Sequence, residues 1–136
     1  MPVSADLNQN IAQMKKLFDR DKTMITRRVT PPGWPEGAIC LFFCDGMVNA
    51  TSINENIIRP LTLMAPPAKG VDRLRYLEES VVQTNEARQS DDWNDLVYSM
   101  VYGDTILFCS GCEKALVLNT KGFAMIEVMS ACPTHY

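Results

Sequence analysis

Two nearly continuous apolar stretches decide the fold, AICLFFC at residues 38–44 and TILFC at residues 105–109. An uninterrupted apolar run is typical of a strand that is covered on both faces, because a half-exposed strand would alternate apolar and polar residues. Each run ends in turn chemistry, Asp45-Gly46 after the first and residues 110–113 after the second. The pattern therefore predicts two buried strands of one sheet.

The rest of the chain supplies helices and shorter strands. In residues 93–101 the apolar positions recur at i, i+3, i+4, i+7 and i+8, which is the pattern of an amphipathic helix, and Gly103 is its expected left-handed stop. The core stripe of this helix would include Val97 and Val101. Helices are predicted at residues 7–18, 53–61, 71–79 and 93–101, and further strands at 25–29, 81–84, 115–119 and 123–128.

The second helix carries two local signals. Ser52 and Glu55 have the spacing of a capping box, so Ser52 is its expected N-cap. Pro60 falls inside the helical pattern and has no backbone N–H, so we expect a kink there or a restart as a second helix.

Together these elements predict an α/β domain of the α+β type. We expect a mixed sheet of four or more strands, ending in an antiparallel C-terminal meander and packed by about four helices. The length of 136 residues suits a single domain, placed at residues 1–129, with residues 130–136 as a frayed tail.

Composition excludes some classes of function. The net charge of −3 and the scattered Lys and Arg residues argue against a nucleic-acid-binding protein, which needs clustered positive charge. No run approaches the roughly 20 apolar residues of a membrane-spanning helix, and the first residues lack a signal-peptide layout. The chain as given is expected to be soluble, and it is also compatible with being one piece of a larger membrane protein.

Five cysteines are the main candidates for chemistry, and with no secretion signal we expect them to be reduced. Cys40 and Cys44 on one extended strand would lie about 13 Å apart, too far to share a tetrahedral zinc ion. Cys109-Ser110-Gly111-Cys112 is a CxxC motif, but it falls in a predicted hairpin rather than at the start of a helix, where redox pairs usually lie. Small apolar cysteines in the core are the favoured interpretation, and a thiol-redox role for Cys109 and Cys112 stays open.

No catalytic, cofactor or metal site is predicted. His135, the one histidine, lies next to the end of the chain, and no glycine-rich phosphate loop is present. Asp45 and Asp104 flank the buried strands and are expected mainly to serve turns. Trp34 lies in a proline-rich loop and is expected to be exposed, either as an anchor for a protein partner or folded back on the sheet.

Eight segments carry a resemblance to a known family: Leu7 to Ile11, Ile25 to Val29, Cys40 to Val48, Ile53 to Leu61, Gly103 to Leu107, Gly111, Lys114 to Leu116 and Thr120 to Phe123. In this order along the chain, they resemble the N-terminal soluble domain of the A subunit of spore nutrient germinant receptors, the GerA/SpoVAF family. The family pattern continues with E-P-x-x-E and R-G-P-R-E-G-F motifs, so we expect this chain to be the first soluble subdomain, excised or shortened. The five cysteines are not part of the family pattern.

The resemblance implies a non-catalytic module of a receptor in the spore inner membrane, which responds to amino acids, sugars or nucleosides. The expected partners are other A, B and C type subunits and a second copy of the chain, with membrane contact only through segments absent here. A second interpretation is that this domain binds the nutrient itself, in a concave polar site at strand ends near Asp45, Asn49 or Asp104. The third is the thiol-redox protein using Cys109 and Cys112.

Overall fold

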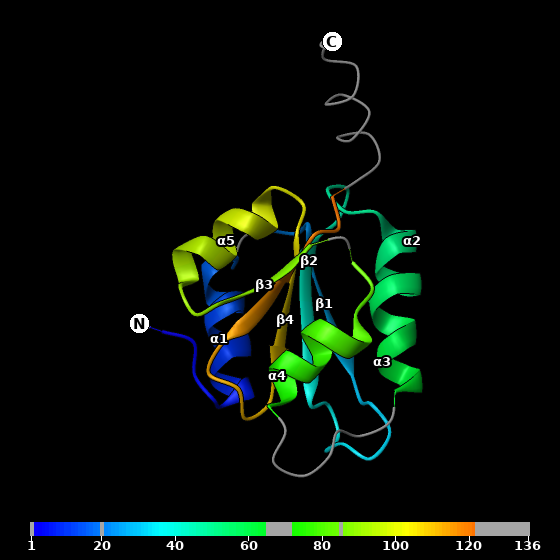
Figure 1. Cartoon of the computed structure of the whole chain (residues 1–136). Coiled ribbons are helices and arrows are strands. Elements are labelled where there is room, and N and C mark those ends of the chain that lie inside the picture. The colour runs from blue at the N-terminus through cyan, green and yellow to red at the C-terminus, as the bar shows by residue number, and fades with distance from the viewer. Residues whose placement is uncertain (1, 20, 65–71, 85, 122–136) are drawn as a thin grey trace.

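The computed structural model describes residues 2–19, 21–64, 72–84 and 86–121, and it has the α+β fold that the sequence predicts. Five strands form one sheet in the order β1-β2-β4-β5-β3 (Figure 1). The two strands predicted to be buried are neighbours in its middle, with Leu41 opposite Leu107. The strands are β1 (Met24–Val29), β2 (Ile39–Cys44), β3 (Ala87–Ser90), β4 (Thr105–Cys109) and β5 (Ala115–Leu118).

All four pairs of described strands are antiparallel, so the expected mixed sheet is corrected to an antiparallel one. The short loop between β1 and β2 permits only antiparallel pairing. For β2 and β4, the position of Gly103 shows why the two strands are antiparallel. A methyl group on Gly103, just before β4, would lie 2.6 Å from the carbonyl oxygen of Met47, just after β2. Because β4 begins where β2 ends, the two strands run in opposite directions.

Helices cover both faces of the sheet, giving three layers (Figure 1). The helices α1 (Leu7–Leu17) and α5 (Trp93–Val101) pack on one face. The other face is covered by a long helical segment and a shorter one. The long segment is α2 (Ala50–Ile53), η1 (Asn54–Ile58) and α3 (Arg59–Leu63), and the shorter one is α4 (Arg73–Tyr76) with η2 (Leu77–Val81).

The central strands are buried at every position because alternate side chains enter two separate cores. Cys40 and Phe42 of β2 pack with Phe108 of β4 against α1 and α5. Leu41 of β2 and Leu107 of β4 pack on the opposite face against the other helices. The sequence prediction of two buried strands is therefore confirmed, and the two cores explain why neither strand alternates apolar and polar residues.

The second helix differs from its prediction at the N-cap and agrees with it at Pro60. Its N-cap is Asn49, whose side-chain oxygen accepts the N–H of Ser52, so Ser52 lies inside the first turn. The chain stays helical across Pro60, but the π-helical segment η1 ends at Ile58 and α3 begins at Arg59 with Pro60 in its first turn, as the restart prediction expects. Pro60 has no N–H for the carbonyl of Asn56, four residues earlier, and that carbonyl instead accepts the backbone N–H of Gln83 at 2.8 Å. The proline thus frees an acceptor that ties the helix to the segment after η2.

The predicted strand at residues 81–84 is wrong, and β3 replaces it. Val81 ends η2, and the N–H of Val82 donates to the carbonyl of Leu77, which terminates that helix. The strand forms instead at residues 87–90, where pairing with β5 outweighs a sequence without apolar alternation. The predicted strand at 123–128 and the predicted tail at 130–136 lie outside the described residues, so the expected meander is observed as the β4–β5 hairpin. No helix in the described residues has the length and apolar character needed to cross a membrane.

Candidate functional site

The three residues predicted to mark a ligand site are divided between two places. Asp45 is exposed in the turn after β2, and its backbone N–H donates to the carbonyl of Thr23 at 2.7 Å. It therefore has the turn role that its sequence context favours. Asn49 and Asp104 meet at the other location, next to residues 120–121.

Asn49 and Asp104 are held together through Thr120 and Lys121. The backbone N–H of Asn49 donates to the carbonyl of Thr120 at 2.8 Å, while the Asn49 side chain caps α2. The Nζ of Lys121 lies 2.8 Å from Oδ1 of Asp104, in an ion pair whose Asp104 side chain is only 14% exposed. Both predicted residues thus lie at one end of the sheet, and both already have partners within the chain.

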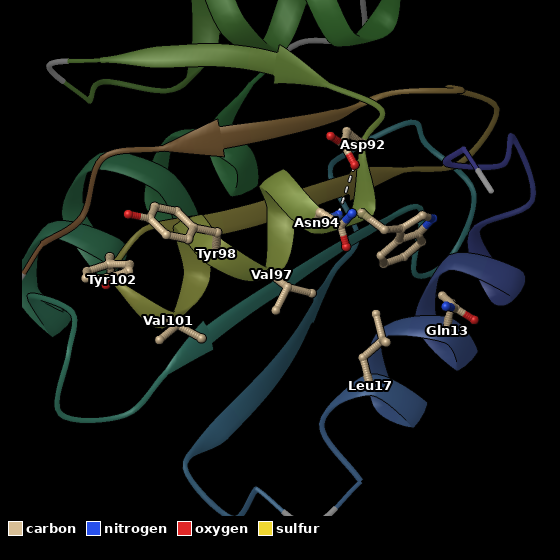
Figure 2. A pocket seen from close by; sticks show the side chains of 9 residues that line it. Gln13, Leu17, Asp92, Asn94, Val97, Tyr98, Val101 and Tyr102 are labelled. Atoms are coloured by element: carbon tan, nitrogen blue, oxygen red, sulfur yellow. Dashed lines mark hydrogen bonds between the residues drawn. The ribbon is translucent and has the colours of Figure 1, made fainter.

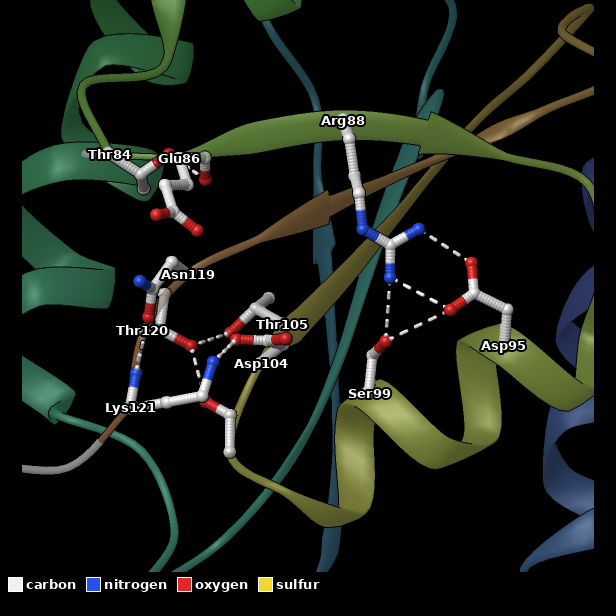
Figure 3. A network of polar contacts seen from close by, with 11 residues as sticks. Thr84, Glu86, Arg88, Asp95, Ser99, Asp104, Thr105, Asn119, Thr120 and Lys121 are labelled. Carbon is white, nitrogen blue, oxygen red and sulfur yellow. Dashed lines mark hydrogen bonds and ion pairs between the residues drawn. The ribbon is translucent and has the colours of Figure 1, made fainter. Parts of the chain in front are cut away.

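A buried hydroxyl pair lies beside this ion pair (Figure 3). The Oγ1 atoms of Thr105 and Thr120 are 2.7 Å apart, and Thr120 also donates to the carbonyl of Gly103 at 3.0 Å. Because a hydroxyl has one hydrogen to donate, Thr105 must be the donor in the pair. These two bonds join the ends of β4 and β5 to the turn that stops α5.

Arg88 makes a second polar cluster, which the sequence did not predict. From the edge strand β3 its guanidinium reaches α5, where it binds both carboxylate oxygens of Asp95 at 2.5 and 2.8 Å and the hydroxyl of Ser99 at 2.9 Å (Figure 3). The hydrogen bond from Arg88 lowers the pKa of Asp95 to about 2, and the same contact raises the pKa of Arg88. A bidentate pair of this kind fixes the edge strand to the helix.

A hollow of about 240 Å³ lies between the two polar clusters. It contains charges of both signs, so its chemistry would suit a small zwitterionic or polar molecule. Arg88 and Lys121 are already paired with carboxylates, so a ligand would have to compete with these ion pairs. The hollow is lined by Glu86, Ala87, Arg88, Asp104, Val117, Asn119 and Lys121.

An exposed apolar surface lies between α1 and α5. Leu17 on α1 and Val101 on α5 both line this surface and are 47% and 46% exposed (Figure 2). On the adjoining side of α5, the rings of Tyr98 and Tyr102 contact each other at a tilt of 40°, with centroids 4.6 Å apart, and are also exposed. The groove has a volume of about 630 Å³. We call the surface made by Leu17, Val97, Tyr98, Val101 and Tyr102 the α1–α5 groove.

The sequence analysis missed this groove because periodicity placed Val101 in the core. The core stripe of α5 is in fact narrower, with Trp93, Leu96 and Met100 buried and Val101 exposed. The signal that was available is the tyrosine pair at i and i+4, which lies beside an already complete apolar stripe. An apolar stripe wider than the core requires is a reason to expect a contact surface.

Trp34 is buried, with 9% of its surface exposed, so the prediction that it is exposed is wrong. It packs into the core on the α2–α4 face, and the guanidinium of Arg73 lies over its ring, 5.1 Å from the centroid. Its fold-back alternative is therefore the observed arrangement. A role for Trp34 as a partner anchor stays an untested prediction.

The four cysteines within the described residues are distributed over both faces of the sheet, and Cys132 lies outside those residues. Cys40 and Cys44 point toward α1 and α5, whereas Cys109 belongs to the opposite core. These two pairs therefore do not converge on one ion, and no cluster of three or more potential metal ligands occurs within the described residues.

Comparison with known proteins gives consistent matches. The family described as Bacillus/Clostridium GerA spore germination protein matches residues 12–131. Spore germination protein KA of Bacillus subtilis (strain 168) is 22% identical over 120 residues, which cover 88% of this chain and 22% of that protein. The chain thus matches only about a fifth of the length of this relative.

Among solved structures, the fold is similar to the N-terminal domain of the A subunit of the Bacillus megaterium spore germinant receptor GerK3. The TM-score is 0.62 at 16% identity, and the match covers 91% of this chain and 49% of that one. At this identity the likeness shows a shared fold.

Proposed function

Because the chain belongs to the Bacillus/Clostridium GerA spore germination protein family, we propose that it is a non-catalytic module of a germinant receptor A subunit, which relays the nutrient signal and assembles with other subunits. In this proposal the full-length protein lies in the spore inner membrane, and its partners are A, B and C type subunits. The module itself works through protein–protein contacts.

The observation that carries this proposal is the α1–α5 groove. Its apolar side chains come from two helices. Of the five large hydrophobic residues that are exposed in the described part of the chain, four lie on this groove. Contiguous exposed apolar surface on a soluble domain is typical of a protein contact, because it gains free energy when a partner removes it from water.

The carboxylates support a structural rather than a catalytic use of polar groups. Asp6, Asp72 and Asp92 are N-caps of α1, α4 and α5, and each accepts the N–H of the residue two positions later. Asp95 and Asp104 are held in ion pairs. A general acid or base needs a group poised for its substrate, and each of these carboxylates already serves the fold.

The test is to introduce charge on the groove in a full-length receptor. Val101→Glu is expected to reduce co-purification of the other receptor subunits and to slow the fall in optical density of spores after nutrient is added. Leu63→Glu is the matched control, since Leu63 is 72% exposed on the other side of the sheet. Both variants are expected to leave the melting temperature of the 136-residue chain unchanged, because both side chains are exposed. Equal co-purification and germination in the two variants would reject the groove as the contact surface.

The hollow beside Asp104 favours a second candidate, direct binding of a small nutrient. It is supported by charges of both signs around one concave space at a strand end. A ligand that binds only the folded state at a hundredfold excess over its dissociation constant would add about 2.7 kcal/mol of stability. A thermal-shift titration with amino acids, sugars and nucleosides tests this candidate. The shift should disappear in Asp104→Asn and persist in Asp45→Asn, and a shift that survives both changes would place the site elsewhere.

A further inference from the structure

The CxxC motif forms a four-residue turn, Cys109 to Cys112, at the start of the loop between β4 and β5. The backbone N–H of Cys112 donates to the carbonyl of Cys109 at 3.1 Å, and Gly111 has a φ of 84°, which lets the chain reverse within four residues. The first and last Cα atoms of such a turn lie within about 7 Å. A disulfide spans Cα atoms roughly 4.4–6.8 Å apart, so this turn suits a bridge between its ends.

The two thiols differ in their access to solvent. Cys109 is 1% exposed within the core on the α2–α4 face. Cys112 is half-buried and lines an open cavity of about 630 Å³ together with Arg73, Gly111 and Lys114. A reagent of that size can therefore reach Cys112 first, while Cys109 is protected by the fold.

The neighbouring Cys109 thiol also favours Cys112 as the reactive thiol, because it lowers the pKa of Cys112. A hydrogen bond from the Cys109 thiol lowers the pKa of Cys112, with a smaller contribution from the positive charge of Arg73, against opposing effects of burial and Asp72. The same shared proton and burial raise the pKa of Cys109. Burial raises the pKa of Cys40 to about 11, so this cysteine stays a thiol.

We propose that Cys109 and Cys112 form a thiol-modification site, at which Cys112 reacts with a low-molecular-weight disulfide and Cys109 completes an internal disulfide. In the first step the Cys112 thiolate attacks one sulfur of the small disulfide, forms a mixed disulfide and releases one small thiol. In the second, the Cys109 sulfur loses its proton, attacks the Cys112 sulfur of the mixed disulfide and displaces the second small thiol. The two protein thiols are oxidised and one small disulfide is reduced to two thiols, so atoms and electrons balance.

This site is independent of the proposed receptor role, since neither cysteine lines the α1–α5 groove or the hollow at Asp104. The disulfide would connect Cys109 and Cys112 across a turn that also holds Arg73. Nη1 of Arg73 donates a hydrogen bond to the carbonyl of Ser110 in this turn, at 3.0 Å. Because Arg73 also stacks on Trp34, the bridge lies next to a contact between α4 and the loop before β2.

The experiment uses the reduced 136-residue chain, oxidised glutathione as the probe, quenching with N-ethylmaleimide and peptide mapping by mass spectrometry. Wild-type protein is expected to give a peptide with a Cys109–Cys112 disulfide. Cys109→Ala is expected to retain one glutathione on Cys112. Cys112→Ser is expected to carry neither adduct nor bridge on the peptide that contains residues 109–112. Without the oxidant, N-ethylmaleimide is expected to modify Cys112 at least about tenfold faster than Cys40. The pKa of Cys40 is raised and that of Cys112 is lowered, and each pKa unit changes the thiolate population about tenfold.

The matched control is Cys40→Ser, which removes a core thiol outside the site and should leave the bridge unchanged. Melting curves of all variants show whether a substitution at the buried Cys109 unfolds the chain. The alkylation rates of the wild-type chain test whether Cys112 is the more reactive thiol without any substitution at Cys109. Glutathione that persists on wild-type Cys112, oxidation that appears first at Cys40 or Cys44, or equal alkylation rates at Cys112 and Cys40 would each overturn the proposal.

Discussion

Replacing Asn49 with alanine is expected to lower the free energy of unfolding by about 1 kcal/mol. The side-chain oxygen of Asn49 accepts the N–H of Ser52 at 3.1 Å, and alanine leaves that N–H of the first helical turn without its partner. The backbone bond from Asn49 to Thr120 does not depend on the side chain, so it remains. Because the site is half-buried, water replaces the lost acceptor only in part, which places the cost in the middle of the usual range for N-caps.

In a domain of this size, that change corresponds to a fall of about 4 °C in melting temperature. Urea unfolding followed by tryptophan fluorescence is a suitable assay, because Trp34 and Trp93 are both buried in the folded chain. Asn49→Ser retains an N-cap acceptor and should stay within about 0.5 kcal/mol of wild type. Asn8→Ala makes the same chemical change on an exposed surface of α1 and should likewise have little effect.

The serine variant separates the capping role from a ligand role. If Asn49 only caps α2, serine preserves both stability and any nutrient-induced shift. If Asn49 holds a nutrient through its amide, serine preserves stability but abolishes the shift. An unchanged urea midpoint in Asn49→Ala, or equal losses in the alanine and serine variants, would refute the assignment of Asn49 as the helix cap.

Three further predictions concern the fold around the candidate site. Arg88 lowers the pKa of Asp95 from 3.8 to about 2, so their interaction stabilises the fold fully above about pH 4 and is lost as the pH falls through about 2. The urea midpoint of wild type should therefore exceed that of Asp95→Asn at neutral pH, and the difference should shrink toward pH 2. A difference that stays constant with pH would contradict this linkage. Gly103→Ala should destabilise the domain more than Gly46→Ala in the same assay, because both glycines have positive φ but only a methyl group on Gly103 would meet a backbone oxygen, at 2.6 Å; equal losses would show that the clash relaxes without cost. Phe108→Ala should lower the free energy of unfolding in urea by about 3–5 kcal/mol, because it removes a fully buried ring from the core between the sheet and the helices α1 and α5. A loss below about 1 kcal/mol would mean that the core collapses around the cavity.

The elements that could be predicted from sequence are those whose signal is contained in their own residues. The continuous apolar runs identified β2 and β4, and the helical spacing of residues 93–101 together with Gly103 identified α5 and its stop. The strand β3 was missed because its four residues are stabilised by pairing with β5 and by the bond from Arg88 to α5. Neither interaction leaves a periodic pattern within the segment itself.

The candidate sites show the same division. The sequence analysis placed Asn49 and Asp104 at strand ends, but their proximity results from the antiparallel return of β4 and from residues 120–121. Trp34 was expected to be exposed because its neighbours are prolines and glycines, whereas a core contact and Arg73 bury it.

By itself, then, the sequence determined the α+β class, the two buried strands, the helix before Gly103 and the resemblance to germinant receptor subunits. Only the tertiary structure decided the strand order, the α1–α5 groove, the hollow beside Asp104 and the difference between Cys109 and Cys112. The physical reason is that burial, pairing and charge at a residue depend on neighbours distant in the chain, which periodicity and local motifs do not encode.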